Sequence, residues 1–573
     1  MKKNIKYTFV CMLLLASACS DFLEEENKSN IVADEFYTTA SGYEALVNAT
    51  YSTLRNIYGE LPYVFTYGTD LYTSGRGTPP SVGLLNYRDL DATESNVLNL
   101  YRTLYEGIQL ANTALYFNEI TEEVETLSVR EGEVRFLRAY FYFLLVQSFG
   151  DVPLVTERVS SVILGFEREP SANVYTFIID EMQAAMGLVP ENQDDEGRVN
   201  KRVIRHYLAK VFLTRGYQPY GEAEDFNTAA EYADAAIAGQ GLNLTFEDLF
   251  YPGNEDNEEV IFAVQYDRSS ILNPSSDGNT QNYWFGPYLG GEGTKFGYPN
   301  RAYSLVPSLY AFDVFSEKGM YDARWEATFM TEMYVPDPSI PGAGANTVGY
   351  YRYYTEADNR ENIPVKIFYA HKWVDPVAWR AANPATRANT EIRPFEQPAG
   401  DPNWRSWEAS EDTNLDNATP AVKKFDDPTS EFSTNGSSTR DIFLARLGET
   451  YLIAGEAYYK AGDAGTAADR INEVRRRAAK PGAEDQMEIT AAEVDIDFIL
   501  DERARELLGE YHRWFDLKRT GTLAERNLAH NSVLKKLGVN PFGDGTLKTL
   551  RPIPQTVINL NESIGPEDQN PGY

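Results

Sequence analysis

Near the C-terminal end of the chain, apolar residues recur at three- and four-residue spacing, a pattern that leaves few folds open. This spacing puts the apolar side chains on one face of a helix. Gly462-Asp463 interrupts the pattern, which predicts two helices joined by a short turn. The apolar positions are Leu444, Leu447, Tyr451, Ala454, Tyr458 and Ala461 in the first helix and Ala467, Ile471, Val474 and Ala478 in the second.

This helical hairpin also fits the tetratricopeptide pattern, in which each repeat is a pair of helices. Gly455, Tyr458 and Ala467 match the pattern outright, other apolar residues replace its Trp, Leu and Phe, and Pro481 comes slightly late. Glycine inside a helix lowers the stability of the helix by about 1 kcal/mol relative to alanine. We therefore expect a neighbouring helix to approach Gly455 closely. An ordinary amphipathic hairpin is the alternative at this point.

Two further helices are expected in the N-terminal half of the chain. The first is predicted to be buried on one side, and it ends where Gly150 breaks the pattern and Pro153 prevents its continuation. The second is closed by Gly239. Their apolar stripes are Val134, Leu137, Phe141, Leu144, Leu145 and Ser148 in the first and Ala229, Tyr232, Ala233 and Ala236 in the second.

From residue 241 to residue 437 the chain is rich in Pro and Gly and has long stretches without periodicity, such as Pro336–Ala345. Glu259–Tyr266 is the one clear strand pattern. Long irregular segments inside a folded chain are usually functional loops. We therefore divide the chain into a helical region at 19–240, loop-rich ligand-binding insertions at 241–437 and a second helical region at 438–573, after a leader at 1–18.

The leader has a basic head, Lys2, Lys3 and Lys6, followed by the apolar stretch Tyr7–Ala18. Twelve helical residues span about 18 Å, which is too short to cross about 30 Å of hydrocarbon. This pattern is typical of a secretory signal. Small residues stand directly before Cys19, as in a bacterial lipoprotein signal, so we expect lipidation at Cys19. Cys11 would leave with the signal, and ordinary secretion with a free Cys19 is the alternative.

The charge balance excludes nucleic acid as the main partner. Asp and Glu number 85 against 52 Lys and Arg, and the net charge is −33. Nucleic-acid binding needs a positive surface, and the longest basic run is Arg475-Arg476-Arg477.

Signals for catalysis or for bound metal are weak. The four histidines, His206, His371, His512 and His530, do not pair at metal-ligand spacing. An EF-hand-like run starting at Asn192 has Val203 where a bidentate Glu is needed. Gly291-Glu292-Gly293 lacks the rest of a phosphate loop, and there is no G-x-S-x-G elbow. We predict no catalytic residue, no metal and no cofactor. Glycoside hydrolase activity is a further alternative, because it needs only two suitably placed carboxylates and 85 acidic residues will contain such a pair by chance.

The positive signal is a clustering of aromatic residues in predicted loops. An aromatic ring packs on the flat C–H face of a sugar, while Asp and Arg bond its hydroxyls. Glycines beside the second cluster let its rings stand clear of the backbone. The alternative is that these rings pack loops onto the helical core. The candidate ligand-binding residues are Tyr67, Asp70, Tyr72, Arg76 and Tyr87 in the first cluster and Trp284, Tyr288 and Phe296 in the second.

Several segments resemble the SusD/RagB family of surface nutrient-binding lipoproteins. Together with Cys19 they cover almost the whole chain after the leader. They are Glu133–Glu157, Ala229–Tyr266, Leu444–Lys480, Asp501–Arg519, Leu550–Pro554 and Gln569–Tyr573. The loops between them carry no family motif, so the binding residues named above come from local chemistry alone.

The resemblance implies a mainly α fold in which tetratricopeptide-like hairpins form a right-handed superhelical body with an irregular ligand-binding subdomain and a few short strands. It implies a non-catalytic protein, lipid-anchored to the outer membrane and facing the cell exterior, that binds oligo- or polysaccharide. It also implies a partner, a SusC-like TonB-dependent transporter that receives the glycan. The same fold binding peptides or protein fragments is the alternative function, since an acidic surface suits basic peptides.

Overall fold

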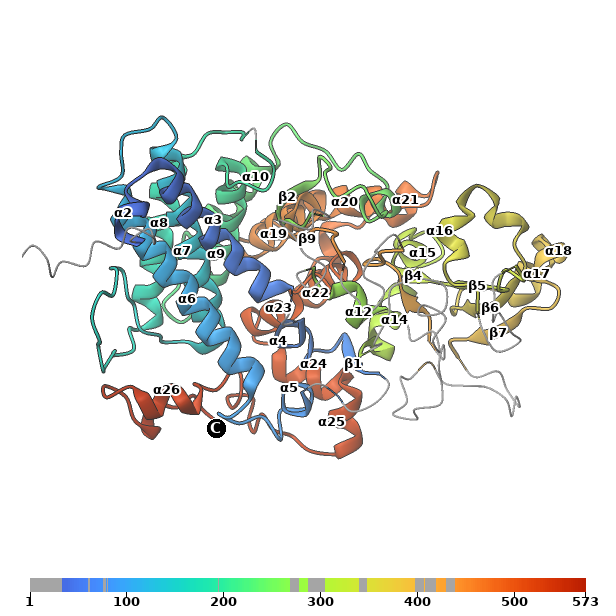
Figure 1. Ribbon diagram of the computed structural model, residues 1–573. Helices are drawn as coiled ribbons and strands as arrows, with labels where there is room; N and C mark the ends of the chain where they lie inside the picture. Colours follow the sequence, from blue (N-terminus) through green and yellow to red (C-terminus); the bar gives the residue numbers. More distant parts are fainter. Residues whose placement is uncertain are drawn as a thin grey trace, which may run out of the picture.

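The computed structural model describes residues 33–59, 62–75, 79, 81–193, 195–267, 278–286, 304–339, 348–396, 407, 419–428 and 438–573. The leader, Cys19 and parts of the middle loops lie outside these ranges. The described chain is mainly α-helical, as predicted (Figure 1).

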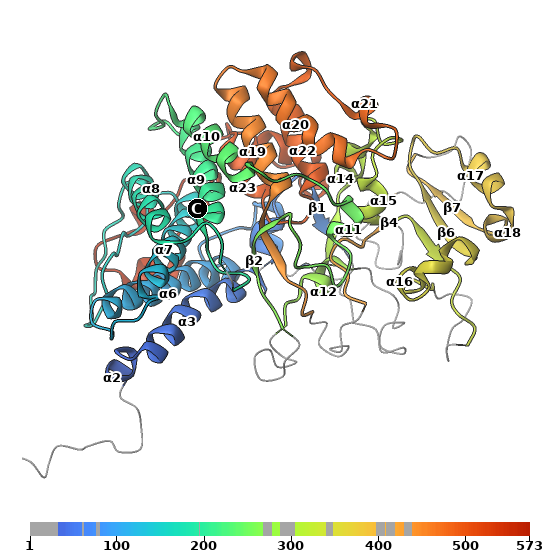
Figure 2. The same cartoon turned by 90° about the horizontal axis from the view of Figure 1, so that it is seen from above.

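Long helices pack as successive hairpins in the N-terminal part. Neighbouring pairs are α6 with α7, α7 with α8, and α9 with α10, and α10 also packs on α19. Figure 2 shows these N-terminal helices beside the C-terminal helices α19, α20 and α22. The long helices are α3 (Ala40–Tyr58), α6 (Ser95–Asn118), α7 (Leu127–Phe149), α8 (Ser171–Leu188), α9 (Lys201–Gly216), α10 (Asp225–Ile237), α19 (Leu447–Lys460), α20 (Ala464–Ala478) and α22 (Ile496–Glu506).

Helix α7 contains the predicted stripe and ends at Phe149, before Gly150, whose φ is +74°. The prediction of one buried side was wrong, because every residue from Phe136 to Phe149 is buried. Helices α6 and α8 both pack on α7, and Arg138 of α7 bonds Asn112 of α6 and Glu181 of α8, so its polar positions are also enclosed. Asp151 then accepts hydrogen bonds from the backbone N and the hydroxyl of Ser171, at 2.7 and 2.6 Å, at the start of α8.

The predicted C-terminal hairpin is α19 and α20, joined by a turn in which Gly462 has a φ of +92°. A Cβ on Gly455 would lie 2.8 Å from Cγ1 of Ile471, which confirms the expected close approach of the second helix. Leu444 was placed in the helix by its spacing, but it belongs to strand β9 (Ile442–Arg446), and α19 begins at Leu447. Strand and helix follow one another without a loop here, so the apolar spacing runs on through the boundary.

The strands are short and form small separate sheets. The predicted strand is β2 (Val260–Val264), which pairs antiparallel with β9 and so joins the middle of the chain to the C-terminal region. Strand β6 (Val365–Ala370) is central in a three-stranded sheet that forms the lobe at the far end of the molecule from α6 and α7 (Figure 1). The other strands are β1 (Tyr72–Ser74), β3 (Leu305–Pro307), β4 (Phe329–Met330), β5 (Glu332–Tyr334), β7 (Glu391–Pro394) and β8 (Ala421–Val422).

Short helices fill the remaining described chain. They are α2 (Ala33–Tyr37), α4 (Pro62–Thr66), α5 (Val82–Asn86), α11 (Phe246–Leu249), α12 (Gln281–Phe285), α14 (Leu309–Asp313), α15 (Arg324–Thr328), α16 (Arg352–Thr355), α17 (Pro376–Ala382), α18 (Pro384–Arg387), α21 (Glu484–Met487), α23 (Arg513–Arg519), α24 (Leu523–His530), α25 (Ser532–Leu537) and α26 (Gln555–Leu560), with 3₁₀ turns at Val314–Ser316, Ala357–Asn362, Ala491–Glu493 and Pro566–Asp568.

A network of buried ion pairs surrounds α22 inside the C-terminal region. Arg324 bonds Glu502 at 2.8 Å and Glu506 at 3.0 Å, and Arg446 bonds Glu506 at 2.7 Å. These side chains are all fully buried. Removing one member would leave an uncompensated buried charge, which is strongly destabilising. The network therefore ties α15, β9 and α22 to one arrangement.

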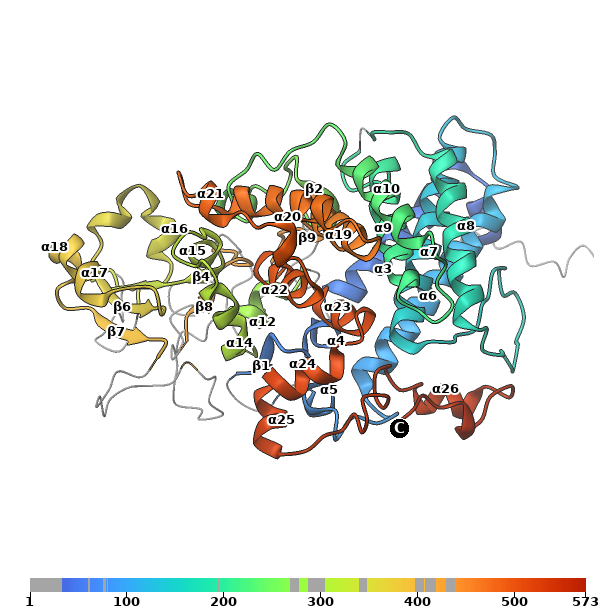
Figure 3. The same cartoon turned by 180° about the vertical axis from the view of Figure 1, so that it is seen from behind.

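The C-terminal third of the chain is bonded to residues 64–90 near the N-terminus. Arg551 donates to the carbonyl of Val64 at 2.7 Å, and the ammonium of Lys548 donates to the carbonyl of Leu90 at 2.9 Å. The side-chain amide of Asn531 donates to the carbonyl of Leu85 at 3.0 Å. Figure 3 shows α24 and α25 beside α5 and β1, and α26 below α6.

Candidate ligand-binding face

The first predicted cluster lies in the core. Tyr67 and Tyr87 are fully buried, and their hydroxyls donate to the carbonyls of Ser304 and Gly68 at 2.8 and 2.7 Å. Tyr72 lies in β1, where its ring meets the ring of Phe285 at 5.3 Å. These rings pack β1 and α5 onto the helical body.

Asp70 is also fully buried, and its carboxylate accepts hydrogen bonds from Nε and Nη2 of Arg513, at 2.8 and 2.6 Å. In this structure Tyr67, Asp70, Tyr72 and Tyr87 therefore present no surface to a ligand. For these four the ligand-binding hypothesis is corrected: their burial supports the packing alternative. Arg76, Tyr288 and Phe296 lie outside the described residues.

Trp284 differs from the first cluster, because its side chain is partly exposed. It lies on α12, where its ring meets that of Tyr283 at 4.6 Å and that of Tyr63 at 5.1 Å. The indole Nε1 donates to the hydroxyl of Thr280 at 2.9 Å. This bond and the buried Tyr63 ring fix the orientation of the indole. Tyr283 and Trp284 thus form a pair of partly exposed rings on one short helix.

The position of α12 is fixed from both of its ends. Asn279 and Ser438 exchange backbone hydrogen bonds at 2.9 and 2.8 Å, and the hydroxyl of Thr280 donates to the carbonyl of Gly59 at 2.8 Å. The buried Phe285 ring packs against Phe425 at 4.9 Å. The exposed rings therefore rest on a rigid support, which lowers the entropy cost of binding a ligand.

Polar groups without a protein partner lie under this helix. The side chain of Asn282 is 1% exposed, and neither its amide oxygen nor its amide nitrogen has a hydrogen-bond partner within the described residues. The hydroxyls of Tyr63 and Tyr72 are in the same state. Such a group costs about 1–3 kcal/mol if it stays unpaired, so we expect ordered water to bond it. Asn282 was not singled out from the sequence, where a lone Asn carries no signal.

An acidic cavity of about 420 Å³ opens at Arg440, whose carbonyl accepts a hydrogen bond from the side chain of Asn279, just before α12. The guanidinium of Arg440, at its wall, donates to Glu255 and to the carbonyls of Asp426 and Phe250, so this cation is already engaged. Nearby, burial, together with the carboxylates of Glu255 and Glu196, raises the pKa of Asp441 to about 7. The cavity is lined by Pro252, Gly253, Glu255, Tyr266, Asp267, Asp427, Thr439 and Arg440.

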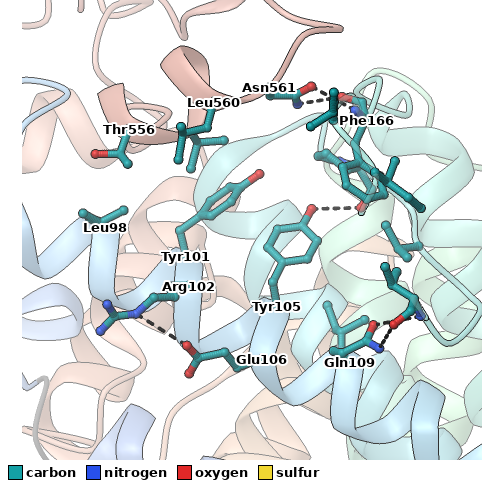
Figure 4. A pocket seen from close by; sticks show the side chains of 17 residues that line it. Leu98, Tyr101, Arg102, Tyr105, Glu106, Gln109, Phe166, Thr556, Leu560 and Asn561 are labelled. Atoms are coloured by element: carbon teal, nitrogen blue, oxygen red, sulfur yellow. Dashed lines mark hydrogen bonds and ion pairs between the residues drawn. The ribbon is translucent and has the colours of Figure 1, made fainter. Parts of the chain in front are cut away.

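A larger cavity of about 540 Å³ lies away from the predicted loops, between α6, the segment after α7 and α26 (Figure 4). We call it the apolar groove. Tyr101 and Tyr105 point into it from α6, and Leu560 faces them from α26. Its lining is Leu98, Tyr101, Arg102, Tyr105, Glu106, Ile108, Gln109, Pro153, Val155, Val159, Ile163, Leu164, Phe166, Thr556, Val557, Leu560 and Asn561. Sequence reasoning missed it because its three walls are far apart in the chain.

None of the four histidines belongs to α12. Burial lowers the pKa of His512 to about 3 and that of His371 to about 4, so both rings are neutral at pH 7. His371 is stacked between Trp373 at 3.9 Å and Phe395 at 4.7 Å. Within the described ranges no group of three or more His, Cys, Asp or Glu side chains is arranged to hold a metal ion. No helix among the described residues is long and apolar enough to cross a membrane.

Comparison with known proteins agrees with this architecture. Residues 398–573 match the family model described as "SusD family", and residues 21–213 match one described as "Starch-binding associating with outer membrane". The chain is 25% identical to SusD-like protein P2 of Formosa agariphila over the whole of both chains. It is 26% identical to the starch-binding protein SusD of Bacteroides thetaiotaomicron, over 80% of this chain and 76% of the relative.

A solved structure of a laminarin binding SusD-like protein matches the fold with a TM-score of 0.65. The match has 22% identity and covers 93% of this chain and all of that one. The two family models together cover well over half of the chain, and they match both its N-terminal and its C-terminal parts. The chain therefore belongs to the SusD/RagB family.

Proposed function

We propose that this protein captures oligo- or polysaccharide at the outer-membrane surface, without cleaving it, and delivers it to a SusC-like TonB-dependent transporter. Membership of the SusD/RagB family supports glycan binding, as do the starch-binding and laminarin-binding relatives. The observation that carries the proposal is the partly exposed pair of rings, Tyr283 and Trp284, held rigidly on α12.

The chemistry of this face suits a sugar. A ring that is half exposed offers its flat side to the C–H face of a pyranose, and stacking of this kind contributes about 0.5–1.5 kcal/mol beyond the area buried. Gln281, partly exposed on the same helix, adds an amide that bonds hydroxyls. We propose that Trp284 is the central contact and that Arg76, Tyr288 and Phe296 complete the site.

Lipidation at Cys19 would hold the protein at the membrane. Several acyl chains anchor a protein stably, whereas a single chain gives only marginal binding. The transporter would then meet a partner already confined to the same surface, which raises the effective concentration of the pair.

Affinity gel electrophoresis with a panel of polysaccharides tests the proposal, followed by calorimetric titration with the oligosaccharide of any polysaccharide that retards the protein. Trp284→Ala should abolish most of the retardation. Trp379→Ala is the matched control, because Trp379 is also partly exposed but stacks on Phe368 at 3.9 Å in the distant lobe. Equal losses in the two variants, or no retardation by any glycan, would refute the assignment. Product chromatography after long incubation should show uncut polysaccharide.

The alternative, binding of peptides, is favoured by one observation, the acidic cavity. Its lining carries the carboxylates of Glu255, Asp267 and Asp427, while its one arginine is engaged. A basic peptide would find charge complementarity there. Calorimetric titration with a pool of Lys- and Arg-rich peptides decides between the two functions. A binding signal with the peptides and none with the glycans would replace the first proposal by the second.

A further inference from the structure

The apolar groove is lined mainly by apolar side chains, and the polar groups of Tyr105, Gln109 and Asn561 in its walls are bonded to the protein's own backbone. Of its lining residues only Arg102 and Glu106 are charged, and they lie 3.6 Å apart, so the lining is neutral in a chain whose net charge is −33. Burying a sugar hydroxyl against such walls without a hydrogen bond costs about 1–3 kcal/mol for each group. A hydrocarbon chain has no hydroxyl to bury, and each CH₂ group buried in the groove contributes about 0.8 kcal/mol to the free energy of binding.

Large aliphatic side chains stand in solvent along the rim of the groove. Val162 is 87% exposed, Leu560 73%, Leu164 56% and Ile163 48%. A contiguous exposed apolar patch of this kind marks a binding surface rather than an ordinary protein exterior.

Hydrogen bonds keep this rim open instead of letting it collapse into the groove. The side-chain amide of Asn561 bonds both the N–H and the carbonyl of Phe166, each at 2.8 Å, and the backbone N of Glu562 donates to the carbonyl of Leu164 at 2.9 Å. On the opposite wall the hydroxyl of Tyr105 donates to the carbonyl of Pro153 at 2.8 Å. The groove is therefore preformed.

We propose that the groove binds an acyl chain of a membrane lipid, so that this face of the protein rests on the bilayer. The inference rests on the proposed location at the outer membrane. Neutral walls, a lining of aliphatic side chains and aromatic rings, and an aliphatic rim together fit hydrocarbon, and the rim side chains would enter the boundary between headgroups and acyl chains.

The reach of the N-terminal tether agrees with this orientation. The ring of Tyr37 in α2 packs on Phe117 at 5.3 Å, near the C-terminal end of α6, and the groove begins at Gln109 on the same helix. Eight residues of helix separate the two points by about 12 Å. The 14 residues from Cys19 to 32 can span about 50 Å at most. A lipid-anchored chain therefore brings the groove within reach of the membrane that holds the anchor.

Vesicle flotation of the full mature chain with Cys19→Ala tests the proposal without the anchor. This variant has no thiol, because the only other cysteine, Cys11, leaves with the signal. Val162→Cys then gives one site for a polarity-sensitive dye. Val377→Cys is the matched control, since Val377 is 75% exposed on α17 in the opposite lobe. With neutral phosphatidylcholine vesicles we expect flotation and a blue shift of the dye at position 162 only.

Replacing Ile163 and Leu560 together by Ser should lower the vesicle partition coefficient by about tenfold or more, because two aliphatic contacts are lost. Absence of flotation, or equal dye shifts at positions 162 and 377, would overturn the proposal. Binding of a monomeric free fatty acid without flotation would also contradict it, since the source would then not be the bilayer. Glycan retardation of the same variants should be unchanged, so failure here is distinguishable from failure of the proposed function.

Discussion

Replacing Asp70 by Asn should reduce the stability of the protein rather than its affinity for a glycan. The sequence suggested Asp70 as a ligand-binding residue, whereas the structure buries its carboxylate and pairs it with Arg513. The substitution keeps the size of the side chain, removes its charge and replaces one of its two acceptor oxygens by an NH2 donor. Arg513 would then be left buried without a counter-charge from this residue, with the new amide oxygen and the carbonyl of Leu500 as acceptors.

The expected magnitude follows from the geometry of this pair. Two short parallel bonds, at 2.8 and 2.6 Å, hold the carboxylate, and the Arg513 side chain is only 8% exposed. Breaking a buried ion pair by removing one partner typically costs about 3–5 kcal/mol, because the other charge stays uncompensated. We expect a loss in this range for Asp70→Asn.

Denaturant unfolding followed by tryptophan fluorescence measures this loss, since the buried Trp514 adjoins Arg513. Asp89→Asn is the control: Asp89 also takes two bonds from one arginine, Arg88, each at 2.9 Å, but both side chains are at least 42% exposed. The unfolding midpoint of the control should hardly change, because exposed ion pairs contribute little. Unchanged stability of Asp70→Asn with lost glycan binding would refute our assignment of Asp70 to the core.

Three further predictions concern other parts of the chain. The pKa of Asp441 is raised to about 7, so the folded protein holds a proton that the unfolded chain releases near pH 4, and stability from this group falls as pH rises between these values. The gain in unfolding midpoint from Asp441→Asn should therefore be larger at pH 8 than at pH 5, and a constant difference would contradict it. Gly455→Ala should destabilise by on the order of 1–3 kcal/mol, because its Cβ would overlap Ile471, whereas Gly465→Ala, which meets only Asp463 at 3.5 Å, should not. Cells fed radiolabelled palmitate should label the wild type and not Cys19→Ala, and an unlabelled wild type would remove the proposed anchor.

Local sequence patterns predicted the helices well. Periodic apolar residues and glycine breaks placed α7, α10, α19 and α20, because each depends on neighbours within a few residues. They did not show how deeply α7 is buried, since that depends on α6 and α8 packing on it. The strand β9 was missed for the same reason: its partner β2 lies about 180 residues earlier.

The candidate site was harder to predict, because aromatic residues in loops have the same composition whether they face solvent or the core. Tyr67 and Trp284 both stood in predicted loops, yet only Trp284 remains partly exposed. The acidic cavity combines residues near 255 with residues near 440. Their spacing along the chain does not indicate that they are close in the folded protein. Separate loops assemble such surfaces only after the helical body has formed.

The bonds from Arg551, Lys548 and Asn531 back to residues 64–90 bear on how the protein matures. The groups that bond these early segments follow them in the chain by at least 446 residues. A nascent chain emerging from the ribosome thus lacks the contacts needed to lock its early segments. Those early segments would stay unlocked until the later ones are made, which would suit the secretion that the leader predicts.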